Sequence, residues 1–189
     1  MSHSPAEPRR HRLTVADYYR MGETGILAPD ARVELIDGEI IDMAPIGSPH
    51  VWAVLHLDRL FQEAAKNNAF VLVQSPIALD DHSAPQPDLA LLRPRGEHYR
   101  SSLAVPSDVL LIVEVAQSSL RYDRDDKIPL YARHGIPEVW LADLETKRLV
   151  RYRNAQQGTY ASVDQPDLGA PLEIAALPET RIDLSTLFG

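Results

Sequence analysis

The stretch VLLIVEV at residues 109–115 is apolar except for Glu114, which predicts a strand buried on both faces. A second apolar run, DLALL at residues 88–92, opens on Asp88. A buried carboxylate costs free energy unless a cation or hydrogen-bond donors hold it. Two of them on neighbouring strands would repel each other, so we expect a divalent cation between Asp88 and Glu114. Hard oxygen ligands of this kind suit Mg²⁺ or Mn²⁺.

Lys127 follows the two acids and completes a candidate site for phosphodiester cleavage. Such cleavage needs an activated water and stabilisation of the charge that develops at the phosphate, which carboxylate-held metal ions can provide. A lysine near the attacking water can orient it or neutralise that charge. Asp88, Glu114 and Lys127 are therefore candidate catalytic residues, with Asp88 and Glu114 as metal ligands. The alternative for Lys127 is a surface ion pair with Asp123, four residues earlier.

The segment that carries Lys127 is predicted to be a short amphipathic helix. Lys127, Tyr131 and His134 have i, i+4, i+7 spacing and are expected on one face of it. Pro129 would clash deep inside a helix, so the helix either starts close to Asp126 or kinks there. A helix that leans over the sheet edge at this point would bring Lys127 to the two acids.

An Asp37-Gly38 pair separates two apolar runs in residues 32–43, which is the strongest short-range signal for a β-hairpin. With a two-residue turn, Glu34 and Glu39 share one sheet face. We expect Glu34 to enter the site from this hairpin as a further catalytic carboxylate. For Glu39, a place in the site and a place on a solvent-facing edge both remain open.

The other patterns predict two helices and several short strands in an α+β domain spanning residues 13–189, after a flexible leader at residues 1–12. His50 lies in the first turn of the second helix, where it could reach an acid, although a surface position is the more usual one. The sequence shows no repeats and no low-complexity linker. The expected helices are 15–21, after a capping box formed by Thr14 and Asp17, and 48–66, after Ser48 as N-cap with Pro49; the expected strands are 70–74, 77–79, 88–92, 109–115, 138–144 and 148–153, with short extended pieces at 172–174 and 181–188.

The composition is that of an ordinary globular domain of 189 residues, with 44% hydrophobic and 24% charged residues. No cysteine is present, which excludes disulfides and thiolate zinc sites. No signal peptide and no run of ~20 apolar residues is found, so we predict a cytoplasmic protein without a membrane span. The net charge of −8 counts against tight non-specific binding to DNA. Two basic clusters, residues 93–100 and residues 121–127, nevertheless flank the candidate acids.

Five motifs occur in an order that resembles the Uma-type family of putative restriction endonucleases, a branch of the PD-(D/E)XK nuclease superfamily. The resemblance spans roughly residues 13–188. It implies a restriction-endonuclease-like core, in which a central mixed β-sheet is flanked by helices and preceded by the N-terminal helix and β-hairpin. The motifs are ELIDGEI at 34–40, QPDL at 86–89, VEV at 113–115 with Ser118-Ser119, Asp123-x-x-x-Lys127-x-x-x-Tyr131-Ala132, and GIPEVWLAD at 135–143.

The resemblance also implies a divalent metal on Asp88 and Glu114 and assembly as a homodimer, which would suit the two strands of a DNA duplex. One departure is Ala116, which stands where the superfamily pattern places its lysine. We assign that role to Lys127 instead. The predicted function is a Mg²⁺-dependent DNA endonuclease. The alternatives are a non-catalytic protein of the same fold that binds DNA or a protein partner, and a hydrolase of small phosphate esters, which fits the acidic charge better.

Overall fold

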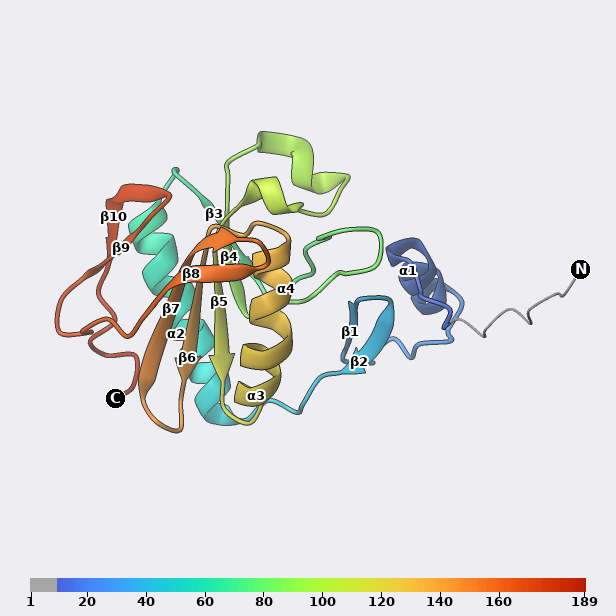
Figure 1. Cartoon of the computed structure of the whole chain (residues 1–189), viewed down its shortest axis with the longest axis horizontal. Helices are drawn as coiled ribbons and strands as arrows, with labels where there is room; N and C mark the ends of the chain where they lie inside the picture. The colour runs from blue at the N-terminus through green and yellow to red at the C-terminus, as the bar shows by residue number, and fades with distance from the viewer. Residues whose placement is uncertain (1–9) are drawn as a thin grey trace, which may run out of the picture.

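The computed structural model describes residues 10–189, so residues 1–9 of the expected leader lie outside the described residues. Its centre is a mixed sheet in the order β3-β4-β5-β6-β7-β8 (Figure 1). Strands β5 and β6 are parallel, and the other neighbours pair antiparallel. This α+β architecture confirms the predicted fold class. The strands are β3 (Phe70–Val73), β4 (Leu89–Leu92), β5 (Val109–Ala116), β6 (Glu138–Asp143), β7 (Arg148–Gln156) and β8 (Thr159–Asp164).

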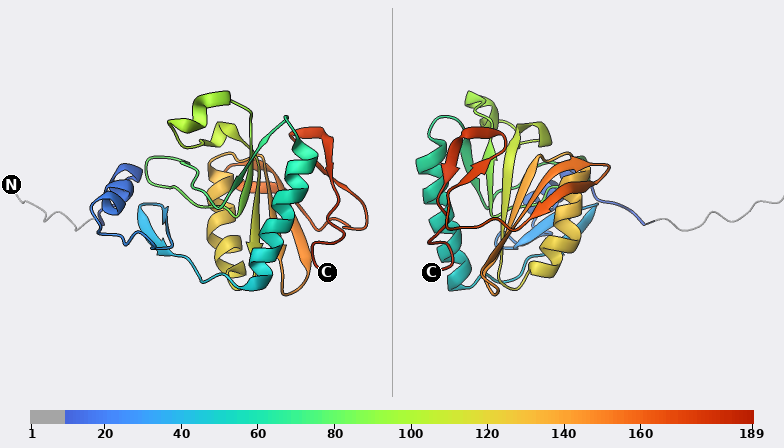
Figure 2. Two further views of the ribbon diagram at one scale, coloured as in Figure 1. Left: turned by 180° about the vertical axis from the view of Figure 1, so that it is seen from behind. Right: turned by 60° about the vertical axis from the view of Figure 1, so that its left-hand side comes forward.

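Helices cover both faces of the sheet (Figure 2). Helix α2 (Ser48–Ala65) packs the predicted apolar stripe, including Leu57 and Phe61, against one face. The crossover from β5 to β6 covers the other face and consists of α3 (Leu120–Tyr122), the π-helical turn η3 (Asp123–Lys127) and α4 (Ile128–Arg133). The antiparallel pair β9 (Leu172–Ile174) and β10 (Leu177–Ile182) adds apolar side chains to the core on the α2 side.

The N-terminal part lies beside the sheet, on the side of the β5–β6 crossover (Figure 1). Helix α1 (Val15–Glu23) begins with the predicted capping box, in which Thr14 Oγ1 accepts a hydrogen bond from the backbone N–H of Asp17. Strands β1 (Val33–Ile36) and β2 (Glu39–Asp42) form the predicted hairpin, with Glu34 opposite Ile41. Two 3₁₀ turns, η1 (Gly96–Arg100) and η2 (Pro106–Asp108), join β4 to β5.

Pro129 explains the π-helical turn in the crossover. Proline has no N–H and its ring clashes with the carbonyl four residues back, so a regular α-helix cannot continue through it. In the turn η3 the backbone N–H of Ile128 donates to the carbonyl of Asp123, five residues earlier. The kink predicted at Pro129 is therefore a widened helical turn placed directly before it.

Three expectations about secondary structure are wrong, and one strand was missed. The extended piece expected at 181–188 ends early, since β10 stops at Ile182 and residues 185–188 form turns. Residues 77–79 do not form a strand, since Ile77 makes only an isolated bridge with Ala104. The N-cap of α2 is Gly47 rather than Ser48. Strand β8 was not predicted, because its half-exposed sequence has no apolar run; its signal is the turn before it, where Gln157 and Gly158 both have positive φ, as hairpin turns of type I′ require.

Candidate active site

Asp88 and Glu114 lie side by side on neighbouring strands. Asp88 directly precedes β4, and Glu114 is in β5, where Leu89 and Val113 are register partners. The backbone N–H of Val115 donates to Asp88 Oδ2 at 2.9 Å, and that of Asp88 lies 3.4 Å from Glu114 Oε2. Because side chains alternate along a strand, both acids fall on the sheet face that α4 covers.

Lys127 lies at the centre of the acids. Its Nζ is 2.7 Å from Glu114 Oε1 and 3.7 Å from Glu34 Oε2, closer than the ~4–6 Å over which charges alter each other's ionisation. It also donates to the carbonyl of Gln86 at 3.4 Å. The residue is only 3% exposed, so the alternative of a surface ion pair with Asp123 is wrong. The structure thus brings Glu34, Asp88, Glu114 and Lys127 together, while their catalytic roles stay predictions.

Two tyrosine hydroxyls donate hydrogen bonds to the buried carboxylates. The hydroxyl of Tyr131 donates to Glu114 Oε1 at 2.6 Å, and that of Tyr122 donates to Glu34 Oε1 at 2.9 Å. Tyr131 could be identified from the sequence, because it was predicted to share a helix face with Lys127. Tyr122 was not predicted, because its partner is 88 residues away in the chain.

His134, expected on the same face, lies elsewhere. Its Nε2 is 3.1 Å from Asp80 Oδ2, on the loop before β4, and its Nδ1 is 2.9 Å from the carbonyl of Leu130. His134 follows Lys127 by seven residues, about 10 Å along a helix, so it contacts the loop before β4 and does not reach the cluster of acids.

His50 is a site residue that the sequence left open. It is 7% exposed, so the usual surface position is wrong here. Its Nε2 lies 3.1 Å from both oxygens of Asp88, and Gln74 Nε2 donates to Asp88 Oδ1 at 3.2 Å. Nδ1 of His50 is buried and has no hydrogen-bond partner among the described residues. The first turn of α2 therefore supplies a direct partner for one of the candidate metal ligands.

Glu39 is not part of the site. Its side chain is 63% exposed and pairs with Arg10 at 3.5 Å. It shares a hairpin face with Glu34, as predicted, but it lies next to the turn, whereas Glu34 is two residue pairs further along the ladder and reaches Lys127. Sharing a face was not enough to place both acids in one cluster.

The surroundings shift the pKa values of the two central acids, Asp88 and Glu114, in opposite directions. Burial raises the pKa of Glu114 to about 8; Lys127 acts against this rise, and Asp123 and Asp88 add to it. Burial also works to raise the pKa of Asp88, but the hydrogen bond and charge of His50 outweigh it, so that the pKa is lowered. Burial opposes the charge on Lys127, yet attraction from the surrounding carboxylates, Glu114 first, raises its pKa. Asp88 is thus held as an anion and Lys127 as a cation.

These side chains surround a cavity of about 290 Å³. One wall is the segment 41–47 that connects β2 to α2, and the opposite wall includes Ser118, Ser119 and Tyr122. Ser118 lines the cavity, and Ser119 occupies the N-cap position of α3. Acidic side chains outnumber cationic ones in the lining of the cavity, even though a pKa of about 8 leaves Glu114 largely protonated at neutral pH when no cation is bound. The acids are Glu34, Asp42, Asp88, Glu114 and Asp123, and the cations are Arg32 and Lys127.

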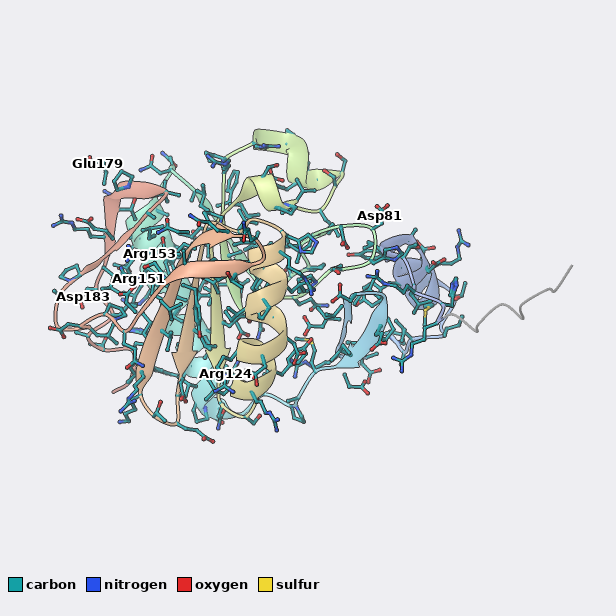
Figure 3. All side chains as sticks on the ribbon, viewed as in Figure 1. Asp81, Arg124, Arg151, Arg153, Glu179 and Asp183 are labelled. Atoms are coloured by element: carbon teal, nitrogen blue, oxygen red, sulfur yellow. The ribbon has the colours of Figure 1, made fainter. Side chains whose placement is uncertain are left out.

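The arginines of the two predicted basic clusters are mostly engaged in ion pairs rather than arranged as a free basic surface. Arg124, labelled in Figure 3, lies 2.7 Å from Asp125. Arg151 and Arg153, also labelled there, share Asp164 on the far part of the sheet. The corresponding pairs in the first cluster are Arg95 with Asp108 at 2.8 Å and Arg100 with Glu97 at 2.7 Å.

Tyr131→Phe tests how strongly the cluster supports the fold. Removing the hydroxyl leaves Glu114 without one of its buried donors, so the free energy of unfolding should fall by about 1–3 kcal/mol. Urea denaturation measures this change. Tyr152→Phe is the matched control, since Tyr152 is half-buried and its hydroxyl makes no hydrogen bond within residues 10–189. Equal stability of the two variants would contradict the structural role of the Tyr131 hydroxyl.

The mixed sheet, with two strand acids and a buried lysine from the crossover helix, defines a protein of the restriction-endonuclease-like α+β class. The family model described as "Uma2: Putative restriction endonuclease" matches residues 15–185. The chain belongs to this family, which confirms the resemblance carried by its motifs.

A solved structure described as "a putative nuclease belonging to DUF820 from Anabaena variabilis" has the same fold. Its TM-score to the chain is 0.69 at 17% sequence identity, and the match covers 93% of this chain and 97% of that chain. No curated protein matches the chain. No helix within residues 10–189 has the length and apolar character needed to cross a membrane.

Proposed function

We propose that the chain is a metal-dependent nuclease that hydrolyses phosphodiester bonds of DNA at the cavity lined by Asp88, Glu114 and Lys127. The observation that carries this proposal is the convergence of two strand carboxylates and a buried ammonium, 2.7 Å from Glu114, in one cavity. Membership of a family described as a restriction endonuclease supports it.

The residues present fit a hard divalent cation. Glu114 Oε1 is taken by Lys127 and Tyr131, whereas Glu114 Oε2 has only a 3.4 Å contact with the backbone N–H of Asp88. This oxygen and the adjacent carboxylate of Asp88 are the candidate ligands, and the negative excess of the cavity favours a cation. No group of three or more His, Cys, Asp or Glu side chains in the described part of the chain is arranged around a metal position. Mg²⁺ (or Mn²⁺) suits such a pair, since it is commonly held by one or two carboxylates with water and substrate phosphate.

The side chains then have separate tasks. When bound, the metal would lower the pKa of a water and offset the charge of the phosphate. Asp88 and Glu114 would hold it, and His50 and Gln74 orient Asp88. Lys127 would donate to the phosphate or to the attacking water as negative charge develops. Glu34, held by Tyr122 and the backbone N–H of Gln86, keeps the ammonium of Lys127 in position. In hydrolysis, the water oxygen bonds to phosphorus, a P–O ester bond breaks, and the leaving oxygen takes up a proton.

The direct test uses supercoiled plasmid and a single-stranded DNA circle, incubated with the purified chain and Mg²⁺ or with EDTA. Nicking or linearisation that requires the cation supports the proposal. DNA binding without cleavage would instead support the non-catalytic alternative.

The small cavity and the net charge of −8 favour a second candidate, a hydrolase of small phosphate esters. A panel of nucleotides and phosphate esters, hydrolysed where DNA is not, would identify that activity.

His50→Ala should lower Mg²⁺-dependent cleavage by about 10–100-fold, the range for removing a residue that orients a metal ligand. The reason is that Asp88 loses the partner 3.1 Å from both of its oxygens. His56→Ala is the matched control, because His56 lies on the same helix but contacts Thr186 at 2.9 Å. Initial rates at saturating and limiting Mg²⁺ measure the effect. Equal rates for both variants would remove His50 from the site.

We also propose that the chain forms a homodimer through the outer face of α2. Val51, Trp52 and Leu55 lie on one face of this helix and are 40%, 49% and 64% exposed. Apolar side chains gathered on a surface indicate an interaction site, and a two-fold axis is the commonest way to pair such a face with a copy of itself. Sedimentation at micromolar concentration should show a dimer, and the double change Trp52→Glu with Leu55→Glu should yield a monomer. A wild-type chain that is only monomeric would contradict the proposal.

A further inference from the structure

We infer that the site takes an unpaired DNA strand, with one nucleotide in the cavity at a time, rather than an intact duplex. This inference rests on the proposed function and names its substrate.

The side chains expected to act on the phosphate are mostly buried, so a large, rigid ligand cannot contact them. The side chains of Lys127, Glu114 and Asp88 are 4%, 2% and 15% exposed. In a duplex the strands are stacked and paired, so that a single nucleotide cannot descend into a recess without leaving the helix. Enzymes that do chemistry on a base in a narrow pocket act on single strands or extrude the nucleotide from the duplex. The same geometric limit applies to a phosphate that must reach groups at the bottom of a recess. An unpaired strand can bend far enough to bring one phosphate to these three side chains.

The cavity has the size of a small-molecule site. Its volume of about 290 Å³ is at the lower end of the ~300–1,000 Å³ typical of ligand pockets. The segment 41–47 forms one side and the start of the β5–β6 crossover forms the other, so the acids are enclosed between two backbone segments. Figure 1 shows the segment from β2 passing below the sheet edge to α2, next to α3. This space admits one nucleotide rather than the width of two strands.

The cavity is chemically divided in a way that matches one nucleotide. Glu34, Asp88, Glu114 and Lys127 form one side, which suits a phosphate, whereas the acid Asp42 belongs to the other wall. The wall at 41–47 presents apolar side chains, Ile41, Met43 and Ile46 among them, which suit the face of an unstacked base. Proteins that bind single strands without sequence preference combine phosphate contacts with stacking of bases on aromatic side chains. Here the aliphatic side chains of the 41–47 wall would take the place of the aromatic ones.

The surface charge fits the same substrate. A protein that holds a duplex usually neutralises several phosphates with free lysines and arginines. Here the cavity is lined by only two cationic side chains, Arg32 and Lys127, and the arginines of the basic clusters are mostly paired with acids. If a bound cation holds a single phosphate in the cavity, the protein does not need a long row of lysines and arginines on its surface.

The test compares one 5′-labelled DNA strand in three forms with Mg²⁺: single-stranded, annealed into a blunt duplex, and annealed to a strand with a central run of mismatches. Bis(4-nitrophenyl) phosphate is the small-ester arm. We expect the single strand and the mismatched region to be cleaved at least about tenfold faster than the blunt duplex, because unpairing is no longer required. Equal or faster cleavage of the blunt duplex overturns the inference but leaves the proposed nuclease function intact. Hydrolysis of the small ester alone, or of nothing, overturns both.

Ile46→Ala adds a test of the apolar wall. Ile46 is 42% exposed at the cavity rim, so its loss should not unfold the chain. The KM for the single strand should rise about fivefold, on the scale of a partly buried aliphatic side chain, and kcat should change less. Val163→Ala, which removes a 56% exposed aliphatic side chain from β8, is the control and should leave both constants at their wild-type values. An unchanged KM in Ile46→Ala overturns the assignment of this wall to the base.

Discussion

Lys127→Ala is expected to lower Mg²⁺-dependent DNA cleavage by about 10²-fold or more, the scale for losing a positioned donor to the transition state. Its ammonium is 2.7 Å from Glu114 and 3.7 Å from Glu34. A phosphate bound beside the two strand acids would therefore contact this ammonium. Metal affinity, measured by calorimetry, should stay the same or rise, because a positive charge that competes with the cation has gone. Lys127→Arg should restore only part of the rate, since a planar guanidinium does not reproduce a compact ammonium.

The same change also affects stability, which must be measured beside the rate. Removing one partner of a buried ion pair typically costs about 3–5 kcal/mol, because the other charge is left uncompensated. Urea denaturation with and without Mg²⁺ separates this loss from the catalytic one, and rates are compared only under conditions where the variant is folded. Arg124→Ala is the matched control, because Arg124 lies in the same π-helical turn but pairs with Asp125 at the surface. A folded Lys127→Ala variant that cleaves as fast as wild type would remove Lys127 from the catalytic residues.

Asp88→Ala should abolish metal-dependent cleavage, with a fall of about 10³-fold or more, because several kcal/mol of charge stabilisation are lost with the metal. Asp88 is held by the backbone of Val115 and by His50 beside Glu114, in the position expected of a shared ligand. Calorimetric titration with Mg²⁺ and Mn²⁺ should show weaker binding in Asp88→Ala and in Glu114→Ala.

Asp81→Ala provides the control for that titration. Asp81 is an exposed acid on the loop near α1, labelled in Figure 3, and does not line the cavity. It reports how far the loss of any carboxylate from an acidic protein changes the binding of cations. If Asp88→Ala binds Mg²⁺ as tightly as Asp81→Ala, the candidate metal site is not at Asp88.

Local sequence patterns were sufficient to predict much of the fold. The apolar run at 109–115 predicts β5, and the Asp37-Gly38 pair predicts the hairpin register that the structure shows. Both patterns act within a few residues, through burial and turn geometry, so they can be recognised without knowing the rest of the chain. Strand β8 has no apolar run of this kind, since its edge position tolerates polar side chains, and the turn at Gln157 and Gly158 is its one local signal.

The four candidate site residues could be chosen from the sequence because a charge inside an apolar run, or in a family motif, has few purely structural explanations. Glu34, Asp88, Glu114 and Lys127 all line one cavity. The residues that surround these four in the structure could not be identified from the sequence in this way. His50 resembles an ordinary first-turn histidine, and Glu39 resembles Glu34 in every local respect.

Which side chains complete the cluster depended on the packing of distant segments. His50 meets Asp88 across 38 residues, and Tyr122 meets Glu34 across 88. Such contacts form because α2 and the hairpin close against the same end of the sheet, and nothing in the local sequence records how two separate segments will approach. The amino-acid pattern specified the strands, the turns and the costly buried charges, because these follow from local burial and backbone geometry. Three-dimensional packing set the partners of those charges, because a buried ion is stabilised by whichever donors the fold brings within hydrogen-bond distance.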